Sequence, residues 1–171
     1  WGGMMWLMYV GTGYEEYRKT AERAELLMDP VLEDYKSLHH DVGFMWHLLS
    51  GALYTLTGDE GSKKRNLFAA STLSSRFVLD GGFIRAWNGW GWDGHAVDDW
   101  SIIDCLMNIP LLYWASRELN DDRFKRIAMA HADMAVECHI RPDGSVIHAA
   151  DHDRETGEVV KTYGGQGISV G

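Results

Sequence analysis

The hydrophobic and polar positions of the chain repeat one pattern three times: an apolar helix, a short polar break and an amphipathic helix. The breaks lie at residues 11–13, 57–59 and 119–121. The pattern predicts apolar helices at residues 4–10, 42–57 and 98–119, and amphipathic partners at residues 14–28, 62–77 and 123–138. Hairpins with one buried and one amphipathic helix are typical of a curved or closed layer, in which inner helices stack and outer helices cover them.

Three hairpins amount to half of a six-hairpin toroid. The predicted fold class is therefore all-α, a helical-hairpin toroid of the (α/α)6-barrel type with about half of the barrel present. A short β-hairpin is predicted beside it, from strands at residues 146–149 and 158–162. Residues 1–171 are assigned to one partial domain. A half toroid leaves inner helices uncovered at its open edges, which predicts truncation or self-association through those edges.

The stretch from residue 98 to residue 114 is apolar on nearly all sides when it is read as a helix, which predicts burial. Ser101, Asp104 and Asn108 then share one narrow face. An unpaired carboxylate in a dry core is very costly, so this face is expected to meet a buried polar network or a water-filled cavity. The cavity is favoured, because the start of this helix is rich in acids and tryptophan. Pro110 lacks an N–H group, which predicts a kink.

Two carboxylates are expected to converge at one mouth of this layer. Asp41 immediately precedes the second apolar helix, and Asp104 lies in the first two turns of the third. Trp87, Trp90 and Trp92 lie on the segment entering the third helix and are expected to line the rim. Two close carboxylates raise the pKa of one of them, which makes a general acid. The alternative is that both acids are structural: Asp41 would be only a helix N-cap, and Asp104 only a buried carboxylate whose hydrogen bonds are all made within the protein.

Composition narrows the classes of function. The formal net charge of −9 argues against a nucleic-acid partner, which would need a basic patch. Eight tryptophans favour a carbohydrate ligand, because rings that line a cleft stack on sugars. Two cysteines, Cys105 and Cys138, are interpreted as small core residues. No metal is predicted, because the histidine and aspartate clusters at residues 39–41, 93–95 and 151–153 lack the spacing of known zinc sites.

The chain shows no signal peptide, and no apolar run reaches the roughly 18 residues of a membrane span, so no membrane partner is predicted. It begins as if inside a helix and ends in a loop. We therefore expect a fragment of a longer bacterial protein, located in the cytoplasm.

Three motifs resemble glycoside hydrolase family 88, the unsaturated glucuronyl hydrolases. The motifs are HHDVGFM at residues 39–45, FIRAWN at residues 83–88 and IIDCLMNIPLLYW at residues 102–114. The resemblance follows the order and spacing of these motifs over most of the chain, and the third motif is long and specific. It implies an (α/α)6-barrel glycosidase without a cofactor, of which the second half is absent here.

The resemblance also assigns roles to residues. It implies that Asp104 is the general acid and base and that Asp41 is its essential neighbour. Trp87 matches the sugar-stacking tryptophan of the family, and His148 and Gln166 match substrate-binding polar residues. An aromatic residue usual after the Gln-Gly pair is replaced by isoleucine at position 168, which weakens the Gln166 match.

The implied substrate is an oligosaccharide with a 4,5-unsaturated glucuronic acid at its non-reducing end. A carboxylic acid protonates C4, water adds at C5, and the hemiketal opens. Arg85 and His148 are candidate donors to the substrate carboxylate, although Arg85 is equally explained as a structural strut. The alternatives are an unsaturated rhamnogalacturonyl hydrolase, a truncated non-catalytic module that binds sugars or assembles with a partner, and a sugar epimerase that would use cavity histidines.

Overall fold

The computed structural model describes residues 1–89 and 96–164. Its helices are α1 (Gly2–Thr12), α2 (Glu15–Glu33), α3 (Val42–Trp46), α4 (Ala52–Thr57), α5 (Glu60–Ser74), α6 (Pro110–Leu119) and α7 (Asp122–His139). A π-helical turn, η1 (His47–Gly51), joins α3 to α4, and a 3-10 turn, η2 (Ile103–Met107), precedes α6. The strands are β1 (Phe77–Val78), β2 (Phe83–Ile84), β3 (Trp100–Ile102), β4 (Ala149–His152) and β5 (Val159–Tyr163).

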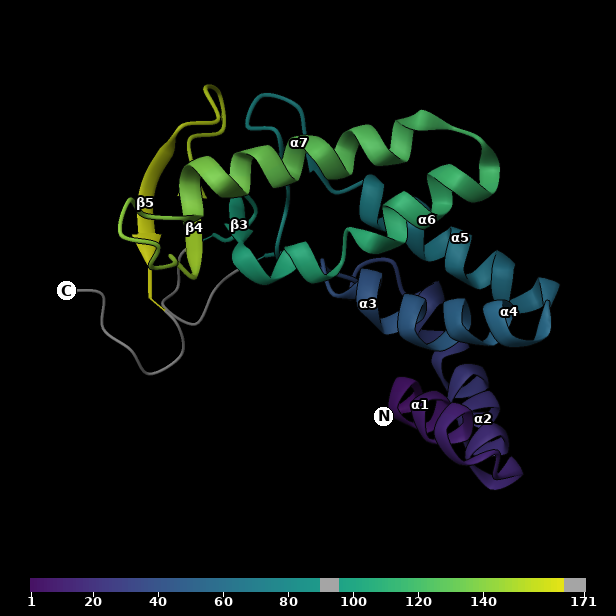
Figure 1. Ribbon diagram of the computed structural model, residues 1–171. Coiled ribbons are helices and arrows are strands. Elements are labelled where there is room, and N and C mark those ends of the chain that lie inside the picture. Colours follow the sequence, from purple (N-terminus) through teal and green to yellow (C-terminus); the bar gives the residue numbers. More distant parts are fainter. Residues whose placement is uncertain (90–95, 165–171) are drawn as a thin grey trace.

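The helices form the three predicted hairpins: α1 with α2, the continuous α3–η1–α4 with α5, and α6 with α7 (Figure 1). Each first helix ends on a left-handed residue, Gly13, Gly58 or Asn120, with φ of 71°, 75° and 50°. Glycine has no Cβ to clash in this conformation and asparagine tolerates it, so the three breaks end the helices as the sequence predicts. The hairpin pattern and the fold class are confirmed.

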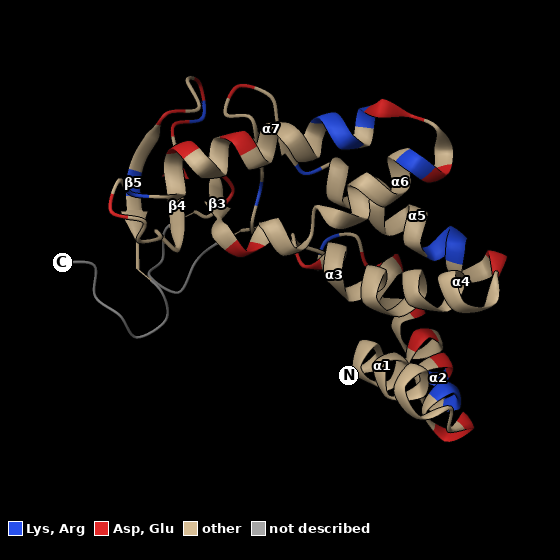
Figure 2. Cartoon of the chain, in the orientation of Figure 1, with Lys and Arg blue, Asp and Glu red and all other residues tan. Residues whose placement is uncertain are grey.

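Ion pairs join neighbouring hairpins on the outer side. Arg65 of α5 makes a two-pronged pair with Asp29 of α2, at 2.6 and 2.8 Å. Lys63 of α5 lies 2.6 Å from Glu118 of α6. Helix α1 carries no charged residue, whereas charges gather on α2 and at the ends of the outer helices (Figure 2). The charge distribution therefore follows the predicted division into apolar and amphipathic helices.

The main core lies where α3, α5 and α6 meet. Trp46, Leu73, Leu111 and Leu112 are fully buried there, together with Ile84 of β2. Each such side chain contributes about 2 kcal/mol through burial of apolar surface. This core fixes the two segments that carry Asp41 and Asp104.

The predicted helix over residues 98–119 is wrong in its first half. Residues 100–102 form strand β3, residues 103–107 the turn η2, and Pro110 starts α6 instead of kinking a longer helix. Proline fits the first turn of a helix, where no N–H partner is needed. Ser101 and Asp104 therefore do not share a helix face. Asp104 is not buried either, because half of its side chain (51 %) is exposed.

A three-stranded antiparallel sheet packs at one end of the helical layer, in the order β3–β4–β5 (Figure 1). The predicted hairpin is confirmed as β4 and β5, although its first strand starts at Ala149 rather than at residue 146. Strand β3 joins it with Ser101 opposite Ala150. The sheet thus brings residues 149–163 next to the segment that carries Asp104.

Other expectations have mixed outcomes. Helix α2 continues past its predicted end at residue 28, through Pro30 to Glu33, because only one turn follows the proline and one backbone hydrogen bond is lost. Cys105 is buried and Cys138 half-buried, and both are free thiols.

None of the helices in the described residues is long and apolar enough to cross a membrane.

Candidate active site

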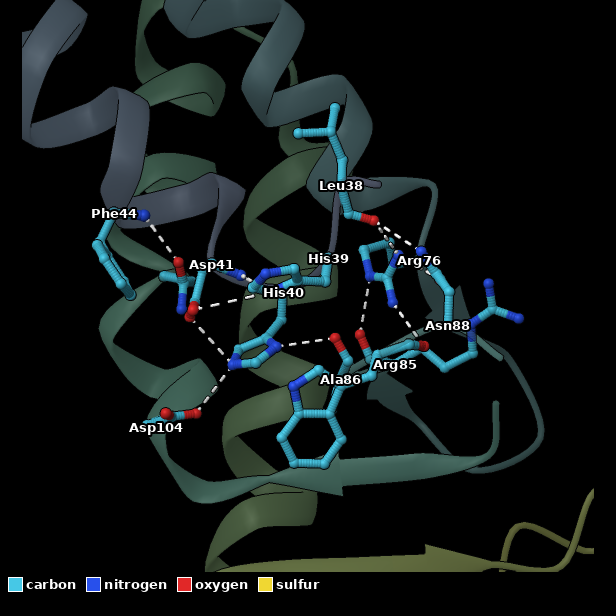
Figure 3. A network of polar contacts seen from close by, with 12 residues as sticks. Leu38, His39, His40, Asp41, Phe44, Arg76, Arg85, Ala86, Asn88 and Asp104 are labelled. Atoms are coloured by element: carbon cyan, nitrogen blue, oxygen red, sulfur yellow. Dashed lines mark hydrogen bonds and ion pairs between the residues drawn. The ribbon is translucent and has the colours of Figure 1, made fainter. Parts of the chain in front are cut away.

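Asp41 and Asp104 meet at one nitrogen of a histidine ring, Nε2 of His40 (Figure 3). The Nε2 atom of His40 lies 3.1 Å from Oδ1 of Asp104 and 3.1 Å from Oδ1 of Asp41. The two carboxylate oxygens are therefore no farther apart than twice that distance. The side chain of His40 is 2 % exposed, against 27 % for Asp41 and 51 % for Asp104. The acids face solvent, and the ring between them lies beneath.

His40 is fixed by the backbone of Ala86. The His40 N–H donates to the Ala86 carbonyl at 3.1 Å, and the ring nitrogen Nδ1 lies 2.8 Å from the same oxygen. The Ala86 N–H in turn donates to the Trp100 carbonyl at 2.8 Å. The segment after β2 therefore connects the histidine to the strand that leads to Asp104.

The buried guanidinium of Arg76, which follows α5, holds together the segment that precedes His40 and the segment that carries Trp87. It donates to the carbonyls of Leu38, Arg85 and Trp87 at 2.9–3.0 Å and to the side chain of Asn88 at 2.9 Å. Burial lowers the pKa of Arg76 to about 10, so it remains charged at neutral pH. Arg76, rather than Arg85, is thus the structural strut between these segments.

The start of α3 packs directly on the end of η2. Asn108 Oδ1 accepts the Phe44 N–H at 2.7 Å. A Cβ atom on Gly43 would lie 2.5 Å from the Cβ of Asn108, so only glycine permits this approach. Asn108 is fully buried, as predicted, but it serves as a connector between the two acid-bearing segments.

The charges of the cluster are coupled. Burial alone would lower the pKa of His40, but the contacts with Asp104 and Asp41 outweigh it and raise that pKa to about 9. Burial would raise the pKa of Asp41, and the neighbouring His40 cation lowers it instead. At neutral pH the cluster therefore contains an imidazolium beside an ionised Asp41. Asp41 occupies the N-cap position of α3 without a side-chain capping bond, so the N-cap explanation fails.

Trp87 forms a wall beside the cluster. Its indole ring meets the ring of His40 edge-on, with centroids 5.8 Å apart and planes at 86°. On its other side Trp87 meets Trp100, at 6.2 Å. The half-buried Trp87 therefore adjoins the histidine that contacts both acids.

The other predicted residues are placed differently. The His148 carbonyl accepts the Ile103 N–H at 3.0 Å, so the backbone of His148 adjoins the residue before Asp104. Figure 3 shows the guanidinium of Arg85 directed away from Asp41 and Asp104, so the structure does not bring it to the pair. Gln166, Trp90 and Trp92 lie outside the described residues.

His40 is the residue that sequence reasoning missed. The sequence places it beside Asp41 in a histidine–aspartate cluster, which suggested only a metal site. His39, His40 and Asp41 do bring three potential ligand atoms within 4.8 Å of one another. Both ring nitrogens of His40 already engage protein oxygens, however, so the described geometry favours a proton over a metal at this position.

No family model matches the chain. It is 36% identical to the unsaturated glucuronyl hydrolase of Bacillus sp. (strain GL1), over 100% of this chain and 45% of that protein. It is 37% identical to the unsaturated chondroitin disaccharide hydrolase of Streptococcus pyogenes serotype M1, over 99% of this chain and 42% of that protein. The chain is a homologue of the unsaturated glucuronyl hydrolases.

The same relationship holds in three dimensions. A solved structure of an unsaturated glucuronyl hydrolase variant with dGlcA-Glc-Rha-Glc matches with a TM-score of 0.90 and 35% identity, over 99% of this chain and 45% of that chain. These neighbours are α/α barrels, so this homologue is part of an α/α barrel. The chain spans less than half the length of the relatives that it matches.

Proposed function

We propose that residues 1–171 are part of one catalytic domain that hydrates the 4,5-double bond of an unsaturated glucuronic acid at the non-reducing end of an oligosaccharide. The observation that carries the proposal is the pair of solvent-facing acids on one buried histidine, beside Trp87. The homologous proteins are named for this substrate class. The expected substrates are oligosaccharides left by polysaccharide lyases, such as those from glycosaminoglycans.

In the proposed reaction Asp104 acts as acid and then as base. Its half-exposed carboxyl gives a proton to C4, and the electrons of the double bond leave an oxocarbenium-like centre at C5. Water adds to C5 and returns a proton to Asp104. The resulting hemiketal opens and releases the rest of the sugar chain. The ionised Asp41 stabilises the positive charge that develops at C5.

The remaining predicted residues are proposed to bind the substrate. Trp87 stacks on a sugar ring at the rim. His148, whose backbone adjoins the residue before Asp104, is the proposed donor to the substrate carboxylate. Gln166 remains a proposed polar contact on the basis of the sequence. Arg85 is a weaker candidate, because its guanidinium is directed away from the acids.

Turnover of an unsaturated chondroitin disaccharide tests this function through loss of the ultraviolet absorbance of the double bond. We expect Asp104→Asn to lower kcat by at least about 100-fold, because general acid–base catalysis contributes about that much or more. Asp133→Asn of α7, remote from the cluster in sequence, is the control and should retain activity. Wild-type activity in Asp104→Asn would contradict the assignment, and wild-type turnover of only pectin-derived disaccharides would favour a rhamnogalacturonyl hydrolase.

A further inference from the structure

The ring of His40 has one nitrogen whose protonation is fixed and one that is able to exchange its proton. A carbonyl oxygen only accepts hydrogen bonds, so Nδ1, at 2.8 Å from the Ala86 oxygen, carries a hydrogen. The other nitrogen, Nε2, lies 3.1 Å from an oxygen of each acid. If His40 were neutral and both acids were ionised, Nε2 and the two carboxylate oxygens would be three hydrogen-bond acceptors in contact, with no hydrogen between them. The cluster therefore holds one proton, on Nε2 or on a carboxyl group.

Exposure decides how this proton reaches a substrate. The side chain of His40 is 2 % exposed and its ring adjoins that of Trp87, so it is almost completely shielded from bulk water. The side chain of Asp104 is 51 % exposed. A proton held on Nε2 therefore leaves towards the substrate through the carboxyl group of Asp104.

Several further groups act on the cluster besides the two acids that His40 contacts. His39 precedes His40, Arg76 lies at the end of α5, Cys105 follows Asp104, and His131 belongs to α7. The cation of Arg76 opposes protonation of His39, and burial keeps the thiol of Cys105 and the ring of His131 neutral. The two carboxylates are thus the groups that hold the proton on His40.

We propose that His40 is a positioning residue that stores the proton delivered by Asp104, while Asp41 holds the charge on the ring; this rests on the proposed function. In each cycle the Nε2 proton passes to the Asp104 carboxylate and from there to C4 of the substrate. Water then adds to C5, its released proton goes to Asp104, and that proton returns to Nε2. One water molecule is consumed, and the protein recovers its proton.

The pH dependence of kcat/KM separates storage of a proton from a merely structural role. The stored proton is lost as pH rises through the raised pKa of His40, so the wild-type activity should fall near pH 9. In His40→Gln, whose amide holds no exchangeable acid, the alkaline limb should move down by at least two pH units. His47→Gln, at a half-buried histidine bonded to Asn66, is the matched control whose limb should not move. If His40→Gln lowered the plateau of kcat/KM but left the pH of its alkaline limb unchanged, the proposal would be overturned.

A titration of His40 by nitrogen NMR tests the same proposal without turnover. We expect Nε2 to lose its proton near pH 9 in the wild type and at least one pH unit lower in Asp104→Asn and in Asp41→Asn. A His40 that titrates near its ordinary value of 6.5 in the wild type would overturn the proposal. A raised value in a chain that turns over no unsaturated disaccharide would instead contradict the proposed function and leave the stored proton established.

Discussion

At the scale of single residues, the site depends on side chains that are almost completely buried. His40 brings the two acids together, Arg76 connects the loops that carry His40 and Trp87, and Asn108 connects α3 to η2. The acids and Trp87 stand out in the sequence, because carboxylates and tryptophan next to apolar helices are unusual. The connectors do not, because a buried arginine satisfied by backbone carbonyls looks in a sequence like any arginine at the end of an amphipathic helix.

Gly43→Ala tests the closest of these contacts. The added Cβ would lie 2.5–2.7 Å from the Cβ, Cα and carbonyl oxygen of Asn108, and the backbone atoms cannot move without shifting η2. Overpacking of this kind costs about 1–3 kcal/mol. We expect a lower free energy of unfolding in urea and an activity reduced more than stability alone explains, because Asp41 moves away from Asp104.

The matched control for this substitution is Gly11→Ala. Gly11 also lies within a helix, and a Cβ there meets nothing within 4 Å. Alanine is favoured over glycine in helices by about 1 kcal/mol, so this variant should be as stable as the wild type or more so. Equal effects of the two substitutions would show that the contact between Gly43 and Asn108 is not needed.

At the scale of elements, the sequence predicts helices well where turn residues mark their ends. Gly13, Gly58 and Asn120 end helices as expected, because their left-handed conformation depends on local chemistry. The stretch over residues 98–110 fails for the opposite reason. Its apolar positions suit a buried strand as well as a buried helix, and pairing with β4, distant in sequence, decides between them.

Ser101 shows why this stretch is a strand. Its hydroxyl lies 2.9 Å from Nε2 of His139 in α7 and 2.7 Å from Nε2 of His152 in β4, and all three residues are buried. Burial lowers the pKa of both histidines. One hydroxyl therefore joins three elements, and it does so only if residue 101 lies in a strand between them.

We expect Ser101→Ala to lower the free energy of unfolding by about 1–3 kcal/mol, because one of the two buried ring nitrogens loses its hydrogen-bond donor. Urea unfolding followed by circular dichroism measures the change. Ser74→Ala is the control: its hydroxyl bonds to the carbonyl of Ser71 within α5, and its loss should cost less than about 0.5 kcal/mol. A loss in Ser101→Ala no larger than in the control would contradict the structural role of this network.

At the scale of the whole molecule, the described chain leaves an apolar groove between the first two hairpins. The groove has a volume of about 890 Å³ and is lined by α1, α2, α3, η1 and α4, with Trp1, Met4 and Leu7 exposed at its edge. An uncovered inner surface is what half of a toroid should show. Self-association through this edge stays a prediction.

The stability of the molecule should peak near neutral pH, because two buried histidines depart from their ordinary pKa of 6.5 in opposite directions. Burial lowers the pKa of His131 to about 4. Between pH 4 and pH 6.5 this histidine is therefore protonated in the unfolded chain and neutral in the folded chain. That contribution is present above pH 6.5 and is lost as pH falls towards 4. His40, with its pKa raised to about 9, contributes fully below pH 6.5 and loses its contribution as pH rises through 9.

Each of these differences amounts to up to about 3 kcal/mol, since one pKa unit corresponds to about 1.4 kcal/mol. We expect the free energy of unfolding in urea to fall on both sides of a maximum between pH 6 and 7 (roughly the ordinary pKa of histidine). The two sides have separate causes, so His40→Gln should reduce the alkaline slope only. His131→Gln should reduce the acid slope without abolishing it, because burial also lowers the pKa of His139 and His152. A free energy of unfolding that keeps rising between pH 7 and pH 9 (the upper bound set by His40) would contradict a proton held between Asp41 and Asp104.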